Sequence, residues 1–219
     1  MVIPSKIIRS NRRSISLSIN DKAELIVRAP IRCSDKKIYD FIVAKESWIV
    51  SKQALMRQSA NEHKCIEVQS GEVIHILSTP YTLVIGECER TTLRGDKIYL
   101  PTKDSKTKLI HLLMRLAKQY ISLRVEHYAR MMGVQYKNIK INQAHTRWGS
   151  CSGEDGLNFC FRLILCTPEV LDYIVVHELC HIREKNHSRR FWALVESILP
   201  NYREQERWLK TNRHIMKII

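Results

Sequence analysis

Residues 171–181 read LDYIVVHELCH, and this stretch decides how the rest of the chain is interpreted. In a helix, His177 and His181 stand four residues apart, so their imidazoles project from one face, one turn above the other. Two neutral imidazoles in this arrangement can bind one side of a tetrahedral zinc ion. Glu178 lies on the adjoining edge of the helix, where it reaches a water on the metal rather than the metal itself.

A third candidate ligand, His187, follows six residues after His181. Three protein ligands leave the fourth tetrahedral position open, as in catalytic zinc sites, whereas structural zinc sites are usually closed by four ligands and rich in cysteine. The cysteines near the helix lack Cys-x-x-Cys spacing. We therefore expect a catalytic site that holds one zinc ion.

The flanking residues argue against a chance motif on a surface helix. Apolar residues between positions 170 and 182 point to nearly every side, which predicts a buried helix. Buried imidazole and carboxylate groups are costly unless they are paired or bound to a metal. Thr167 as N-cap and Pro168 in the first turn predict where this helix begins.

A second helix is expected directly after His187. Ser188 can cap it, apolar residues follow one of its faces at helical spacing, and Pro200 ends it. We interpret Phe191 and Trp192 as core residues that dock this helix. Their packing would then fix the position of His187.

The composition limits the class of protein. The chain has 219 residues, a net charge of +14 and seven cysteines without framework spacing. The N-terminal segment has no apolar signal region, and no apolar run is long enough to span a bilayer, so we expect a cytoplasmic protein with free thiols and no membrane partner. The charge favours polyanions, nucleic acid first, although a generally basic, soluble surface explains it equally well.

The periodicity of apolar residues divides the chain into two parts. The first part is a small α+β unit, with strands expected at 14–19, 23–27, 73–77, 81–85 and 98–100 and a helix at about 35–58. A polar stretch at 102–108 is the expected boundary. The predicted domains are therefore residues 1–104 and residues 105–219.

The second part begins with an amphipathic helix over about 106–132, which Gly133 ends as a C′ residue. Two strands are expected at 137–144 and 157–165. The helix that carries the histidines and the helix after His187 complete the order. The predicted fold class is α+β.

Three motifs carry a resemblance to a known family: TRWGSCS at 146–152, LDYIVVHELCH at 171–181 and NHSRRFW at 186–192. Together they resemble the YgjP-like metallopeptidase family, a zincin group related to the SprT-like proteases, and the likeness covers nearly the whole chain. The resemblance implies a zincin-like metallopeptidase domain built from a long helix, an antiparallel sheet, the HExxH helix and C-terminal helices.

The resemblance also implies roles for single residues. His177, His181 and His187 would bind zinc, and Glu178 would be the catalytic base. An extended substrate would pair with the strand near residues 157–161, as substrates of zincins commonly do.

Two positions depart from related patterns. Metzincins share the spacing of the third histidine but have glycine where this chain has Glu184, so the turn after the helix must take another path. Ser78 and Thr79 stand where we expect a glycine-containing turn. That second departure concerns a strand connection and not the chemistry.

Four further residues are candidates for supporting roles. Arg147 and His145 are candidates for contact with the substrate or with a developing oxyanion, although Arg147 can instead bridge loop carbonyls. Asp172 and Tyr173 are expected to orient the histidine-bearing helix. Asp172 is also a candidate to support a ligand imidazole from the second shell of the metal.

The leading hypothesis is a zinc-dependent metallopeptidase that hydrolyses peptide bonds in intracellular proteins. One alternative, which the positive charge motivates, is a nucleic-acid-associated protease acting on DNA-bound proteins. Another, from a different class, is a catalytically idle binding protein in which zinc orders the C-terminal half.

Overall fold

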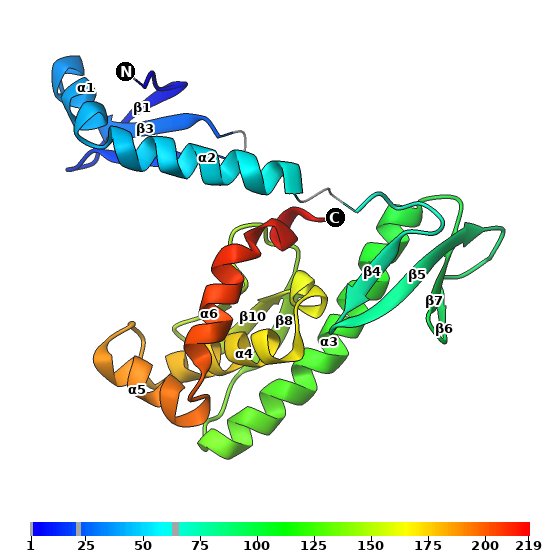
Figure 1. Ribbon diagram of the computed structural model, residues 1–219. Helices are drawn as coiled ribbons and strands as arrows, with labels where there is room; N and C mark the ends of the chain where they lie inside the picture. The colour runs from blue at the N-terminus through cyan, green and yellow to red at the C-terminus, as the bar shows by residue number, and fades with distance from the viewer. Residues whose placement is uncertain (1, 21–22, 63–65) are drawn as a thin grey trace. The chain divides into compact units, whose positions relative to one another are not determined.

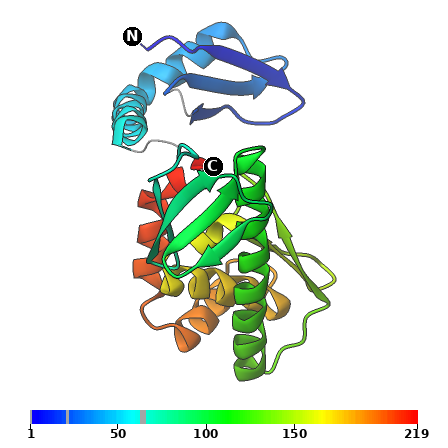
Figure 2. The same ribbon diagram turned by 90° about the vertical axis from the view of Figure 1, so that its right-hand side faces the viewer.

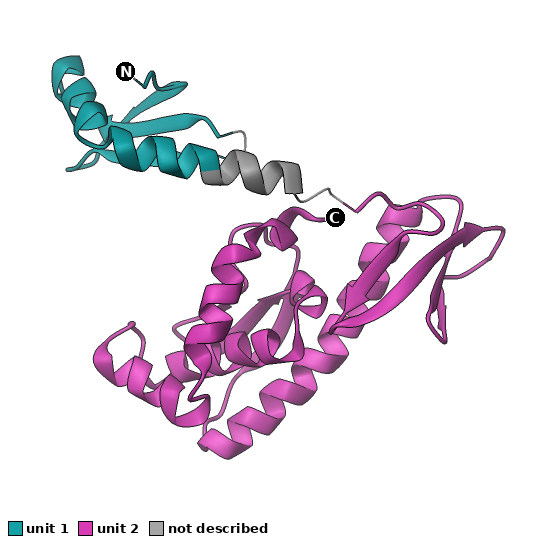
Figure 3. Ribbon diagram, viewed as in Figure 1, with its two compact units in different colours: residues 1–64 teal, residues 65–219 magenta. Residues whose placement is uncertain are grey.

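The protein is an α+β protein, and its computed structural model describes residues 2–20, 23–62 and 66–219. The chain forms two compact units, residues 1–64 and residues 65–219 (Figure 3). Each unit has its own hydrophobic core. We describe each unit by itself.

The first unit packs two helices on a three-stranded sheet. Its elements are β1 (Lys6–Ser10), β2 (Ser16–Ile19), β3 (Leu25–Pro30), α1 (Asp35–Ala44) and α2 (Glu46–Glu62). β3 is the central strand, parallel to β1 and antiparallel to β2. Leu25, Val27 and Ala29 alternate along β3 and are fully buried against Ile38 and Ile42 of α1, as period-two and helical patterns require.

The single helix expected at 35–58 is two helices. α1 ends at Ala44, Lys45 leaves the helical conformation with φ −116° and ψ 14°, and α2 begins at Glu46. This interruption shifts the phase of the apolar face. As a result Ile49 of α2 is fully buried, whereas the neighbouring Trp48 is 46% exposed.

The second unit contains two sheets and the remaining helices (Figures 1 and 2). Its first elements are β4 (Val73–Ile76), β5 (Thr79–Gly86), β6 (Thr92–Arg94), β7 (Lys97–Pro101) and the long helix α3 (Ser105–Met132). Its later elements are β8 (Asn138–Asn142), β9 (Gly149–Cys151), β10 (Gly156–Cys160), η1 (Phe161–Leu165), α4 (Pro168–Arg183), α5 (Arg189–Ile198), α6 (Tyr202–Thr211) and η2 (Arg213–Lys217).

The helix α3 is the centre of the second unit. It lies between the β4-β5-β7-β6 sheet and the part of the unit that holds α4 (Figure 1). Leu83 and Ile98 of that sheet belong to the same hydrophobic core as Leu109 and Leu113 of α3 and Val175 of α4. The predicted helix at 106–132 is confirmed, and Gly133 ends it in the left-handed conformation at φ 61°.

The compact units divide after residue 64, whereas the polar stretch at 102–108 predicts a boundary after residue 104. The reason for the difference is the shared core, because the four-stranded sheet buries its apolar face against α3. A polar segment marks a loop, and a loop does not have to be a division between cores.

The β4–β5 connection forms a tight turn without glycine. Ile76 pairs with Thr79, so the loop consists of Leu77 and Ser78, with φ of 48° and 68°. Two positive φ values are the geometry of a type I′ hairpin turn, which usually contains Asn or Gly. The backbone N–H of Leu77 donates to the carbonyl of Ile164 at 2.8 Å, which helps hold the turn in this conformation.

The sheet beside α4 has the order β8-β10-β9 and is mixed rather than purely antiparallel. β10 is parallel to β8 and antiparallel to β9, because β9 lies inside the long connection between them. The strand expected at 157–165 ends at Cys160 and continues as the 3₁₀ helix η1. Across the described residues, no helix is long and apolar enough to cross a membrane.

Candidate metal centre and active site

The helix α4 begins where its sequence predicts. Thr167 is the N-cap, and its side chain accepts a hydrogen bond from the backbone N–H of Val170 at 3.4 Å. The helix ends at Arg183, and Glu184 follows in an extended conformation with φ −123°. A negative φ does not require glycine, so the backbone accommodates Glu184 at this position.

Three histidines converge on one point, and we call them the histidine triad: His177, His181 and His187. Their ligand nitrogens all lie within 4.8 Å of one another. Nε2 of His177 is 3.0 Å from Nε2 of His187. The structure therefore brings together all three residues that the sequence nominates as ligands.

The two ring nitrogens of His181 face different partners. Its Nδ1 lies 3.0 Å from the backbone carbonyl of Glu184, which can accept a hydrogen bond only if Nδ1 carries the proton. This tautomer leaves the lone pair on Nε2 free toward the other histidines. Fixing the tautomer by a second-shell acceptor is typical of metal-binding histidine.

Burial keeps the centre of the triad neutral. Burial, with a contribution from the two other imidazoles, lowers the pKa of His177 to about 3. Burial also lowers the pKa of His181. Neutral imidazoles offer lone pairs, which is the form that a cation binds.

Aromatic rings of α5 surround the triad. The fully buried ring of Phe191 lies 4.9 Å, 4.5 Å and 4.7 Å from the three imidazoles, measured between centroids. Trp192 stacks on His187 at 5.7 Å. Ser188 caps α5 by accepting from the N–H of Phe191 at 3.4 Å, so α5 begins directly after the third histidine. The interpretation of both aromatic residues as docking residues is confirmed.

The carboxyl group of Glu178 is buried beside the triad, with 5% of the residue exposed. It lies against β9 at Gly149, where an added Cβ would be 2.7 Å from the Cγ and Oε1 atoms of Glu178. The backbone N–H of Cys151 donates a hydrogen bond to this carboxylate. Burial raises the pKa of Glu178 to about 7, although the bond from Cys151 acts in the opposite direction.

Asp172 does not support an imidazole. Its carboxylate accepts hydrogen bonds from Arg124 at 2.6 Å and 2.7 Å and from the hydroxyl of Tyr128 at 3.0 Å. Both donors belong to α3. Asp172 precedes His177 by five residues, about 140° around the helix, so it lies on a different face. It orients α4 by joining it to α3, as one of its two expected roles requires.

Tyr173 contacts the triad directly. Its buried ring lies edge-on to His177 at 5.8 Å and stacks on Tyr202 of α6 at 6.2 Å. Tyr202 in turn stacks on Trp192 at 5.4 Å. A series of aromatic rings therefore connects α4, α6 and α5 behind the histidines.

The two loop candidates occupy different environments. Nδ1 of His145 lies 3.1 Å from the backbone carbonyl of Met216, so that ring contacts η2. Arg147 is exposed and, within the described part of the chain, has no hydrogen bond or ion pair. It does not bridge loop carbonyls there.

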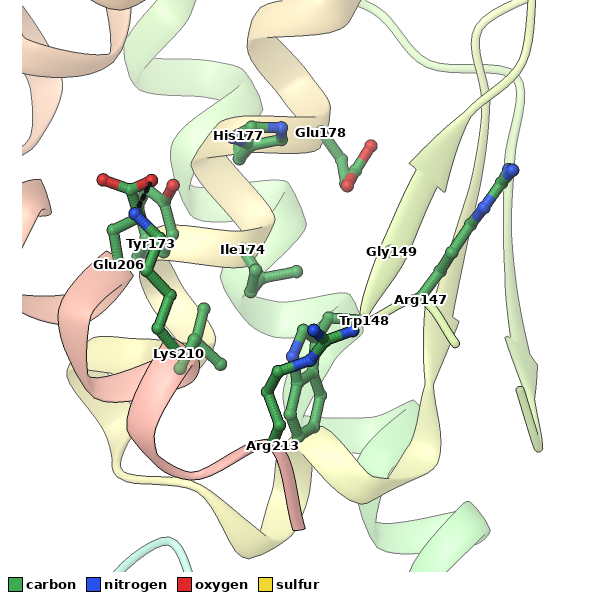
Figure 4. A pocket seen from close by; sticks show the side chains of 11 residues that line it. Arg147, Trp148, Gly149, Tyr173, Ile174, His177, Glu178, Glu206, Lys210 and Arg213 are labelled. Atoms are coloured by element: carbon green, nitrogen blue, oxygen red, sulfur yellow. Dashed lines mark ion pairs between the residues drawn. The ribbon is translucent and has the colours of Figure 1, made fainter. Parts of the chain in front are cut away.

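Two pockets adjoin the centre, with volumes of about 330 Å³ and 640 Å³. Both are lined by Arg147, Gly149, His177 and Glu178, so they open on the two sides of the same residues. Figure 4 shows the smaller pocket, with Glu178 on α4 facing the strand that begins at Gly149. An extended chain that entered both pockets would pass the catalytic candidates.

Sequence reasoning missed the role of Gly149, of the carbonyl of Glu184 and of Tyr202. A signal for Gly149 was present, since it is the single glycine of TRWGSCS, one of the three motifs that carry the family resemblance. No local signal exists for the other two, because a carbonyl belongs to every residue and Tyr202 reaches α4 only through tertiary packing.

Comparison with known proteins identifies the family of the chain. No curated protein matches the chain. The crystal structure of the metallopeptidase zymogen abylysin from Pyrococcus abyssi is 23% identical, with a TM-score of 0.38, and covers 41% of this chain and 92% of its own. That of the zymogen jannalysin from Methanocaldococcus jannaschii is 25% identical, with the same TM-score, and covers 45% and 97%.

Structural similarities with a TM-score this low carry no argument, so the family is assigned from the family comparison alone. The YgjP-like metallopeptidase domain matches residues 13–212, which is most of the chain and includes the whole histidine triad. This chain therefore belongs to the YgjP-like metallopeptidase family.

Proposed function

We propose that this metallopeptidase is zinc-dependent and hydrolyses peptide bonds in intracellular proteins, with Glu178 as the catalytic base and the histidine triad as the ligands of one zinc ion. The observation that supports it best is the convergence of three imidazoles beside a buried carboxylate. Both features come from one helix and the turn that follows it.

The triad fits a zinc ion by the chemistry of its donors. Neutral imidazole nitrogens are ordinary zinc ligands, and three of them leave a fourth position for substrate or water. When bound, such an ion acts as a Lewis acid that lowers the pKa of water and polarises a carbonyl group. Nε2 of His177 is the nitrogen directed at the shared centre, because it lies 3.0 Å from Nε2 of His187. Among the described residues, Nδ1 of His177 is buried without a hydrogen-bond partner.

Glu178 is suited to move a proton. Its raised pKa of about 7 places proton uptake and release near neutrality, where a general base is most effective. It would accept the proton of the attacking water and pass it to the amine that leaves. The N–H of Cys151 and the backbone at Gly149 hold the carboxylate in place for this transfer.

The strand that receives the substrate is β9 in this proposal, rather than the expected strand near 157–161. That strand is β10, whose two edges already pair with β8 and β9. The backbone groups of Trp148 and Ser152 bond to β10. Alternation in an antiparallel pair then directs those of Gly149 and Cys151 to the other edge, beside Glu178.

The test is the pair of variants Glu178→Gln and His181→Ala, with Glu169→Gln on the exposed first turn of α4 as the matched control. We expect Glu178→Gln to retain one zinc ion and to lose roughly 10²- to 10⁴-fold in peptide hydrolysis. His181→Ala should lose the metal, and the control should behave as the parent. Full hydrolysis by the Glu178→Gln variant would refute the assigned base.

Two alternatives follow from other observations. The net charge of +14 motivates association with nucleic acid, in which case DNA binding would weaken steeply as salt increases. An idle binding protein would keep its biological activity in Glu178→Gln and lose it in His181→Ala. Absence of DNA binding at low salt would exclude the first alternative, and loss of activity in Glu178→Gln would exclude the second.

A further inference from the structure

We propose that the smaller pocket beside Glu178, lined also by Arg147 and Arg213, receives a carboxylate of the substrate. The carboxylate belongs either to an Asp or Glu side chain next to the cleaved bond or to the C-terminus of a short peptide. This inference rests on the proposed function, because it names the substrate class of the same site.

The pocket has two kinds of wall. Apolar contact is offered by Trp148, by Ile174 and by Leu209 of α6. Charged groups come from the loop before β9, from the end of α6 and from the start of η2, and they include Arg147, Lys210 and Arg213. In Figure 4 the guanidinium of Arg213 lies beside Trp148, Lys210 is directed to Glu206, and Arg147 extends along the strand on the other side of the view. A volume of about 330 Å³ admits a side chain or a chain end rather than a folded segment.

The positive charges of this pocket are incompletely matched. Nζ of Lys210 is 2.7 Å from Oε1 of Glu206, so these two charges form a pair. Arg147 and Arg213 make no ion pair or hydrogen bond with any residue that the structure describes. The only other acidic group in the lining is Glu178, which the proposed reaction uses.

Two unpaired guanidinium groups at the mouth of a partly apolar pocket favour a planar anion with a short apolar stem. Guanidinium binds carboxylate through two parallel hydrogen bonds, and such charge-assisted bonds are stronger than neutral ones. The methylene groups of Asp or Glu would contact the apolar walls. Lysine or arginine side chains of a substrate would be repelled by the same pocket.

The larger pocket does not share this property to the same extent. Its one additional cation is Lys185, and Nζ of Lys185 is 2.5 Å from Oδ1 of Asp155. Arg147 lines both pockets, whereas Arg213 lines the smaller one alone. Arg213 is therefore the residue whose substitution reports on the smaller pocket.

The first experiment measures cleavage of a peptide library by the zinc-loaded parent, with the products identified by mass spectrometry. We expect enrichment of Asp and Glu at one position beside the cleaved bond. Matched peptides with a free or an amidated C-terminus separate the two sources of the carboxylate. Loss of cleavage on amidation assigns the terminal carboxylate, and unchanged cleavage assigns the side chain.

The second experiment reverses the charge. Arg213→Glu should reduce kcat/KM for acidic peptides by about tenfold, the size expected when one charge-assisted bond is lost. It should raise kcat/KM for peptides with Lys at the same position. The control is Arg207→Glu, which makes the same change on the exposed side of α6 and lines none of these pockets. Equal effects in both variants would overturn the proposal.

A third measurement separates this proposal from the proposed function. The zinc-loaded Glu178→Gln variant, with and without Arg213→Glu, is titrated with a fluorescent acidic peptide and with its neutral amide analogue. Preference for the acidic peptide that disappears with Arg213→Glu supports the carboxylate subsite even if the parent hydrolyses nothing, an outcome that would refute only the protease. Hydrolysis without any acidic preference, in cleavage and in binding, would refute the subsite and leave the protease intact.

Discussion

At the scale of single residues, position 149 admits no side chain without displacing a neighbour. The carboxyl group of Glu178 occupies the space that a side chain at Gly149 would need, since an added Cβ would be 2.7 Å from Oε1. Any other residue has to displace the proposed base. The constraint comes from contact and not from conformation, because Gly149 does not have a positive φ.

We therefore predict that Gly149→Ala lowers peptide hydrolysis on the order of 10²-fold while the metal content stays at the parent's value, because a displacement of about 1 Å at a reacting group has this effect. The matched control is Gly86→Ala in β5, whose added Cβ meets no atom within 4 Å and which lines neither pocket. Activity assays and metal analysis of both variants provide the measurement. Equal activity in the two variants would contradict the contact argument.

The residues of the site that the sequence predicts are those that act within one turn of a helix or within a short loop. His177 and His181 follow from helical spacing, and the cap at Ser188 places His187 next to a helix start. The sequence offered Asp172 as a candidate partner of an imidazole, whereas its hydrogen bonds go to Arg124, 48 positions away along the chain, and to Tyr128. Long-range partners of this kind leave no periodic signal.

At the scale of elements, the link between α3 and α4 leads to a prediction about the stability of the fold. Asp172 and Arg124 have 15% and 29% of their side chains exposed, and two hydrogen bonds join them. We expect Asp172→Asn to lower the free energy of unfolding by about 1–2 kcal/mol, since Arg124 loses its charged partner. Metal affinity should stay unchanged, because Asp172 does not reach the triad.

The matched control for this link is Glu126→Gln, which removes the partner of Arg130 on the exposed face of α3, where the side chains are 60% and 79% exposed. Exposed pairs of this type contribute little. Chemical denaturation and zinc titration of both variants distinguish a link between helices from support of the metal. A tenfold loss of zinc affinity in Asp172→Asn would contradict the expectation that Asp172 stabilises the contact between the helices without supporting the metal.

The aromatic series behind the triad carries a second prediction at this scale. Tyr202 stacks on both Tyr173 and Trp192, and each of these rings contacts a histidine. Tyr202→Leu should weaken zinc binding by about tenfold, the lower end of the range for outer-shell partners. Tyr202→Phe keeps the ring and should bind as the parent does. Competition with a chelator measures both, and equal affinities would show that the ring does not position the ligands.

The elements that the sequence did not predict are short or weakly patterned. β9 has three residues, one of them glycine, and β1 reads KIIRS without strict alternation. α6 reads YREQERWLKT, in which few apolar residues mark a face. By contrast, α3 and α4 are long and have local start or stop signals. The bounds of α3 were predicted within one residue, and α4 begins at the predicted position.

At the scale of the whole molecule, the position of the core predicts which fragments fold. Residues 65–219 contain the four-stranded sheet together with α3, and these share one core. Residues 105–219 alone would expose Leu109, Leu112 and Leu113 of α3 to water. We expect the longer fragment to fold cooperatively and to bind zinc, and the shorter one to lose cooperative unfolding and to bind a hydrophobic dye.

Circular dichroism during heating and dye fluorescence compare the two fragments. If residues 105–219 unfold as cooperatively as the longer fragment, the predicted boundary after residue 104 divides independent domains and the shared core is less important than its burial indicates. The comparison therefore decides between a boundary defined by a polar loop and one defined by packing.

The length of β9 has a consequence for how such an enzyme would choose its targets. A strand of three residues, with one of its outward N–H groups already used by Glu178, offers a pairing peptide very few main-chain bonds. Main-chain hydrogen bonds contribute affinity whatever the side chains of the bound peptide are. If β9 receives the substrate as proposed, an enzyme with so few main-chain bonds would select substrates through their side chains. That is the behaviour of a selective processing protease rather than of a digestive one.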